Sequence, residues 1–168
     1  MKPAIVVTWI ALVAMFIYMQ ARLGSDETDT ARPTGDSHFE LALPMGRIQA
    51  YADKLYFSGR NENWPLAAFY LHEMEEQAEE IVEAKVEEDG IDVSKLTEGF
   101  LLTHIEALEK HVKAGQVEPF LKEYDVLVGR CNACHEATKH GFLKILTPTR
   151  SMFQNQDYAP GPSAPKSL

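Results

Sequence analysis

Cysteine is scarce in this chain: there are only two, Cys131 and Cys134, and both lie in one short stretch. Two cysteines cannot build a disulfide framework, so a small scaffold held together by disulfides is excluded. Basic side chains are also in the minority, with 16 Lys and Arg against 25 Asp and Glu and a formal net charge of −9. Because phosphate binding needs clustered Lys and Arg, we expect no nucleic-acid partner and favour a basic protein partner.

One long uncharged apolar run is present, from Pro3 to Met19, behind the single Lys2. Its length falls between a signal-peptide core and a membrane span of about 20 residues. No small-x-small cleavage site follows, so residues 1–23 are interpreted as a membrane anchor, with a removed signal peptide as the alternative. The acidic stretch after the run favours a domain held outside the cytoplasm, at the periplasmic side of the inner membrane.

The remaining sequence lacks internal repeats and useful period-two strand patterns. Residues 24–42 are interpreted as a linker. Amphipathic helical segments with short connections follow, at about residues 43–58, 64–88, 94–114 and 117–139, with Ser94 and Glu98 expected to cap the third. The predicted fold class is all-α: an antiparallel four-helix bundle over residues 43–146, preceded by an anchor helix. The Pro-rich residues 147–168 are predicted as an irregular tail, ordered at first and disordered at its end.

Both cysteines belong to the motif Cys131-Asn-Ala-Cys134-His135, late in the fourth predicted helix. The apolar stripe of that helix is Val117, Leu121, Tyr124 and Val128. The same spacing places Cys131 and His135 on the inward face, with Cys134 at its edge. Cys-x-x-Cys-His is the attachment signature of c-type haem, in which each thiol forms a thioether to a vinyl group and the histidine ligates iron.

Three other interpretations of the motif fit less well. A thioredoxin-like redox pair needs the cysteines at a helix start, where the helix dipole lowers a thiol pKa. A zinc site needs a second pair of ligands, and only His140 is near in sequence. Two structural thiols beside a surface histidine have no need for this spacing.

On the residues CNACH and the order and lengths of the helices over residues 43–140, the chain resembles class II c-type cytochromes, the cytochrome c-prime group. The resemblance implies one covalent haem c in a four-helix bundle. That group usually ends soon after the motif, whereas 33 residues follow His135 here. We therefore expect the segment after the motif to form a strap that covers a haem edge.

The second axial ligand of the iron decides the function. The haem end of an antiparallel bundle also holds the start of the first helix, so Met45 is the expected sixth ligand, with core packing as its alternative. Low-spin members of the resembling group place a methionine in the first helix. The histidines set aside in its favour are His38, His72, His104, His111 and His140. Arg47 and Arg130 are expected to pair with haem propionates, unless they are only solvated.

The expected function is single-electron transfer by a protein that is not itself an enzyme. A five-coordinate haem that binds small gases such as nitric oxide is the alternative, and a haem relay subunit of a membrane complex is another. The acidic run from Glu73 to Asp89 is either a solvated helix face or a docking patch for a basic redox partner. A homodimer remains open.

Overall fold

The computed structural model describes residues 39–161, and these are mostly helical, which confirms the all-α prediction for this part of the chain. The predicted anchor and the end of the predicted tail lie outside the described residues. None of the described helices is long and apolar enough to cross a membrane. The helical elements are α2 (Ala42–Arg60), α3 (Trp64–Glu83), α4 (Val93–Thr97), the π-helical turn η1 (Glu98–Leu102), α5 (Thr103–Ala114) and α6 (Val117–Ala137).

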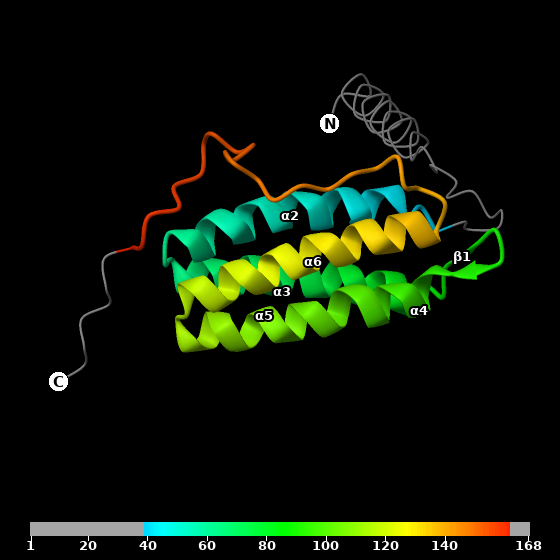
Figure 1. Cartoon of the computed structure of the whole chain (residues 1–168), viewed down its shortest axis with the longest axis horizontal. Coiled ribbons are helices and arrows are strands. Elements are labelled where there is room, and N and C mark those ends of the chain that lie inside the picture. The colour runs from blue at the N-terminus through cyan, green and yellow to red at the C-terminus, as the bar shows by residue number, and fades with distance from the viewer. Residues whose placement is uncertain (1–38, 162–168) are drawn as a thin grey trace, which may run out of the picture. The chain divides into compact units, whose positions relative to one another are not determined.

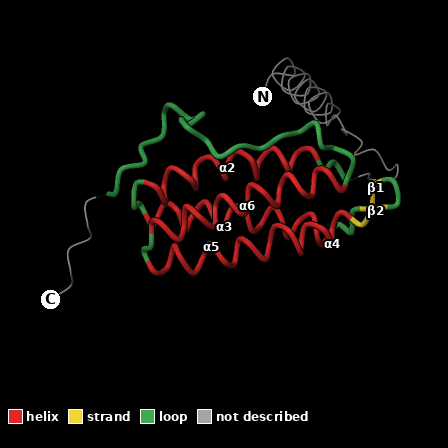
Figure 2. Tube along the Cα trace, viewed as in Figure 1, coloured by secondary structure: helices red, strands yellow, loops and turns green. Residues whose placement is uncertain are grey.

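α4, η1 and α5 follow one another without a break and together form the third long helix of the bundle. The long helices lie side by side, and each runs opposite to the one before it (Figure 1). α2 packs on α3, α3 on α5, α5 on α6 and α6 on α2, so the ring closes around one core. Figure 2 shows that the connections between these helices are short: loops, and a small two-stranded hairpin between α3 and α4. Short connections place consecutive helices next to each other.

The core is built from side chains that recur every three or four positions on each helix. Leu55 of α2, Met74 of α3, Leu108 of α5 and Phe120 of α6 are all fully buried. Burial of one such side chain contributes about 1.5–3 kcal/mol to folding. These buried side chains hold the bundle together. On α6 the buried positions are Phe120, Tyr124 and Leu127, whereas Val117, Leu121 and Val128 of the predicted stripe are only partly buried, so the predicted stripe lies at the edge of the face that packs into the core.

The second helix ends earlier than predicted, at Glu83 rather than near residue 88. A two-residue hairpin follows, in which β1 (Glu87–Glu88) pairs with the antiparallel β2 (Ile91–Asp92). Asp89 and Gly90 between them both have positive φ, at 52° and 76°. An Asp-Gly pair with two positive φ angles is the preferred turn of a tight hairpin, so the chain leaves the helix to make this turn.

The predicted capping role of Ser94 is also wrong. Asp92 begins the third helix instead, because its carboxylate accepts a hydrogen bond of 2.8 Å from Lys95 N. Ser94 is buried, and its hydroxyl donates to Ile81 O and accepts from Val86 N, each at 2.7 Å. Ser94 therefore ties the start of the third helix to the end of α3.

After α6 the chain reverses and returns along the bundle, as the orange segment of Figure 1 shows. We call residues 141–159 the strap. Its second half is held by three hydrogen bonds of 2.8 Å: Ser151 Oγ to Asp53, Tyr70 OH to Gln156, and Asn63 Nδ2 to Ala159 O. The strap is thus attached to both α2 and α3, as well as to α6, from which it emerges.

Gly59, near the end of α2, lies so close to the ring of Phe120 that an added Cβ would overlap ring carbons. Gly59→Ala is expected to lower the free energy of unfolding by about 1–3 kcal/mol, because the fully buried ring cannot move aside. Urea unfolding measures the change. Gly129→Ala is the control: it has open space around it within α6 and is expected to be neutral or stabilising by up to about 1 kcal/mol. Equal destabilisation by both variants would contradict the role given to the Gly59–Phe120 contact.

Candidate functional site

A cavity of about 570 Å³ lies among α2, the third long helix, α6 and the first residues of the strap. That volume is typical of a site for a cofactor or a small molecule, about 300–1,000 Å³. Most of the lining is apolar, and the side chains with polar or charged groups, apart from the two cysteines, are Gln49, Thr97, Tyr124, Arg130, His135 and Lys144. The cavity can therefore take up a largely apolar group that also carries a few charges.

The side chains of the sequence motif line this cavity. Cys131, Cys134 and His135 all do so, from the last two turns of α6. Met45, in the first turns of α2, lines the same cavity, and so does Arg130. The structure thus brings these predicted site residues together, although their separation in sequence is large.

Arg47 is placed differently from the other predicted site residues. It does not line the cavity, and its Nη1 donates a hydrogen bond of 3.1 Å to Gln77 Oε1 on α3. Arg47 is two positions after Met45, which is about half a helical turn. The side chain of Arg47 therefore lies on a different side of α2 from that of Met45, and it contacts the neighbouring α3.

Burial controls the chemistry of the two thiols. It raises the pKa of Cys131 to about 11, with a smaller contribution from the neighbouring Cys134, and it also raises the pKa of Cys134. Both cysteines are free and lie far from the start of α6. A redox-active pair needs a lowered thiol pKa, because the thiolate is the nucleophile. The site therefore favours thiols that stay protonated at neutral pH.

His135 is held by the strap. Its Nδ1 lies 2.8 Å from the carbonyl oxygen of Leu143. A carbonyl can only accept, so Nδ1 carries the proton and Nε2 is the nitrogen with the free lone pair. Metal-bound histidines in proteins usually show this arrangement, with the second ring nitrogen donating to a carbonyl or carboxylate.

The remaining described histidines do not line the cavity. His72 is exposed beside Glu75 and Glu76, as its position on the polar face of α3 predicts. His104 donates from Nδ1 to Glu123 Oε1 at 2.7 Å, which ties the third helix to α6. His111 and His140 contact Gln116 and Thr138 through their own Nδ1 atoms. His38 lies outside the described residues.

Among residues 39–161, no group of three or more His, Cys, Asp or Glu side chains is placed to hold a metal ion. Tyr124 does line the cavity, and its hydroxyl donates to Ala52 O at 2.9 Å. Desolvation on burial raises the pKa of Tyr124 well above its usual value. Tyr124 thus stays a neutral phenol that joins α6 to α2.

Two further residues of the site were missed by sequence reasoning. Met74 was assigned to the core stripe of α3, yet it also lines the cavity and is a second thioether there. Lys144 lines the cavity from the strap and forms an ion pair of 3.0 Å with Glu136. A usable signal for Lys144 was the local charge: residues 130–150 carry four Lys or Arg and one acidic residue in a chain of net charge −9.

Comparison of the chain with family models, with curated proteins and with solved structures finds no match. The functional interpretation therefore depends on the geometry of the cavity and on the motif that lines it.

Proposed function

We propose that this chain is a c-type cytochrome that carries one covalent haem and transfers single electrons. One observation carries the proposal: the thiols of Cys131 and Cys134 and the imidazole of His135, at the spacing of a haem attachment motif, line one apolar cavity. The finer fold assignment belongs to the same proposal: a four-helix cytochrome of class II type with an N-terminal membrane anchor.

The residues of the cavity fit a haem. The porphyrin is large and apolar, and the cavity is mostly apolar with a volume of about 570 Å³. Haem also carries two propionates, and Arg130 and Lys144 supply two cationic side chains at the lining. His135 presents an imidazole whose Nδ1 is held by the carbonyl of Leu143, which leaves Nε2 for the iron. Thiols, imidazole, apolar surface and cations are thus all available from this chain.

Met45 supports electron transfer over gas binding. A bound haem supplies an iron that can gain and lose one electron. His135 would hold that iron from α6, and Met45 would hold it from α2, since both line the cavity. Six-coordinate His/Met iron changes geometry little between oxidation states and leaves no site open to gases.

The proposed location is the periplasmic side of the inner membrane, with residues 1–23 as the anchor and a basic redox protein as the partner. The outer face of α3 supports such a partner, because Glu76, Glu79, Glu80 and Glu83 are all exposed there. Opposite charges steer association, and steering can raise rates by about 10- to 1,000-fold at low salt.

Stopped-flow oxidation of the reduced protein by a basic redox protein tests the proposal. We expect the bimolecular rate to fall as salt rises, because exposed charges are screened over about 10 Å at 0.1 M. The triple change Glu79→Gln, Glu80→Gln and Glu83→Gln is expected to slow the low-salt rate by about tenfold. The matched control is Glu106→Gln, Glu109→Gln and Glu118→Gln, which changes the net charge equally at exposed positions on α5 and α6.

Equal slowing by both triple variants would assign steering to net charge and remove the docking role of α3. A rate that does not depend on salt would reject the basic partner. Rapid binding of carbon monoxide or nitric oxide by the ferrous wild-type protein would reject the electron-carrier assignment and favour the gas-binding alternative.

A further inference from the structure

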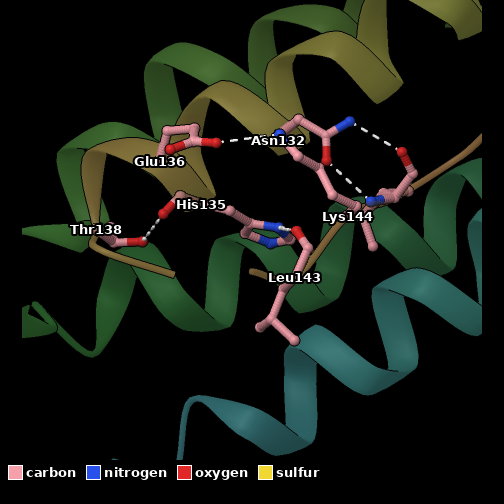
Figure 3. A network of polar contacts seen from close by, with 7 residues as sticks. Asn132, His135, Glu136, Thr138, Leu143 and Lys144 are labelled. Carbon is pink, nitrogen blue, oxygen red and sulfur yellow. Dashed lines mark hydrogen bonds and ion pairs between the residues drawn. The ribbon is translucent and has the colours of Figure 1, made fainter. Parts of the chain in front are cut away.

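Three polar residues at the end of α6 share one face of the helix. Asn132, His135 and Glu136 are three and four positions apart, which places their side chains on the same side. The first residues of the strap lie over this face, as Figure 3 shows for Leu143 and Lys144. The face thus connects the cysteine motif to the strap at the edge of the cavity.

A helix-ending turn brings the strap to this position. Lys139 has a left-handed backbone, with φ of 63°, and the amide of His140 donates to His135 O. This is the hydrogen-bond pattern of a Schellman motif, here made without glycine at the left-handed position. The turn continues with Leu143 N donating to His140 O at 2.8 Å. The chain thereby doubles back toward its own last helical turns.

Asn132 then fixes the strap through two hydrogen bonds to one residue. Its Nδ2 donates to Ile145 O and its Oδ1 accepts from Ile145 N, each at 2.9 Å. Both bonds are made to the backbone of Ile145, so they do not depend on the side chain at position 145. A side-chain amide is the one group of this length that offers a donor and an acceptor side by side.

The other side-chain contacts that hold the strap in this region are weaker than the paired bonds of Asn132. Lys144 and Glu136 are about 60% exposed, and exposed ion pairs typically contribute about 0–1 kcal/mol. Thr147 Oγ1 donates to Asp125 at 2.7 Å, but this contact is also exposed and lies further along the strap. The backbone bond from Leu143 N to His140 O holds Leu143 on the side of the turn, and the paired bonds of Asn132 are the main side-chain constraint on its carbonyl from the other side, two residues before Ile145.

We infer that Asn132 is a positioning residue for His135. Its two hydrogen bonds to Ile145 hold the Leu143 carbonyl next to His135 Nδ1, and that contact fixes the ring as its Nδ1–H tautomer. The tautomer does not depend on the identity of the cofactor. The consequence for iron does rest on the proposed function. A hydrogen bond from Nδ1–H makes the imidazole a stronger donor, which favours ferric over ferrous iron.

Two measurements on the full-length protein test this inference. The first is the solvent exchange of the His135 Nδ1 proton, followed by NMR. Asn132→Leu keeps the approximate size of the side chain and removes both hydrogen bonds, and we expect it to speed exchange at least tenfold. The second is the midpoint potential. Outer-shell changes typically alter metal affinity 10- to 100-fold. A tenfold weaker preference for ferric iron raises the potential by about 59 mV.

The control and a milder variant separate local positioning from general loosening of the strap. Thr147→Val removes the next tie along the strap and is expected to leave both the exchange rate and the potential unchanged. Asn132→Asp keeps the acceptor for Ile145 N only, and both readouts should fall between wild type and Asn132→Leu. Should Asn132→Leu fail to fold, Asn132→Asp decides the question.

An unchanged Nδ1 exchange rate in the Asn132 variants would overturn the inference, as would an equal effect of Thr147→Val. If the purified chain carries no haem, the proposed function is wrong, but the exchange measurement still decides whether Asn132 positions His135.

Discussion

After extraction with acidic acetone, the wild-type protein is expected to retain the mass of one haem, and the double variant Cys131→Ser, Cys134→Ser is expected to retain none. Thioethers survive this treatment, whereas axial ligation by His135 does not. The expectation follows from two free thiols at the lining of one cavity, three positions apart on α6. Addition of each S–H across a vinyl group needs no oxidant, and the raised thiol pKa values disfavour competing oxidation to a disulfide.

Single variants provide the control for attachment. Cys131→Ser and Cys134→Ser should each keep the haem mass through the one remaining thioether. In each single variant the absorption maximum of the reduced protein should shift relative to wild type, because one vinyl group of the haem stays unsaturated. Loss of haem from the wild-type protein during extraction would reject covalent attachment and reopen the interpretation of the motif.

The helices could be predicted from the sequence because each depends on a local pattern. The apolar spacing of α3, through Leu71, Met74 and Ala78, is sufficient to give a helix and its buried face. The same reasoning placed Cys131 and His135 inward on α6, and both line the cavity. Helix periodicity thus predicted the part of the site that α6 contributes.

The ends of elements were harder to predict, because tertiary contacts determine them. α3 ends at Glu83 although helix-forming residues continue to residue 88. The buried hydroxyl of Ser94 bonds Val86 N and Ile81 O, which stabilises the chain where it leaves the helix. Nothing in the local sequence distinguishes this Ser94 from a helix cap, since the two roles differ only in what lies next to the hydroxyl.

The strap's part of the site could not be derived from local pattern either. Its reversal depends on Lys139 in a left-handed conformation, where glycine or asparagine would have been the usual signal. Its attachment depends on the side chain of Asn132 meeting a backbone 13 residues away. The motif predicts which residues would attach a haem, but the contact between His135 and Leu143 exists only in the folded chain.

Met45→Leu is expected to convert a low-spin ferric spectrum into a high-spin one and to open the ferrous iron to carbon monoxide. Leucine keeps a similar apolar volume and removes the thioether sulfur, so packing changes little while the ligand is lost. The midpoint potential should fall by on the order of 100 mV, because a methionine ligand raises it and axial ligands together span about 0.8 V. Absorption spectroscopy in both oxidation states and a redox titration measure these changes.

Met74→Leu is the matched control, because Met74 is the other methionine that lines the cavity within the described chain. Met74 is fully buried in the core of α3, whereas Met45 is only partly buried at the start of α2, where a side chain can move toward a cofactor at lower packing cost. Met74→Leu should therefore leave the spin state and the carbon monoxide reactivity unchanged. The reverse outcome, with an unaltered spectrum in Met45→Leu and a high-spin one in Met74→Leu, would show that Met74 of α3 is the axial ligand. A high-spin ferric spectrum in the wild-type protein itself would mean that neither sulfur binds, and Met45 would then be a packing residue beside an open iron.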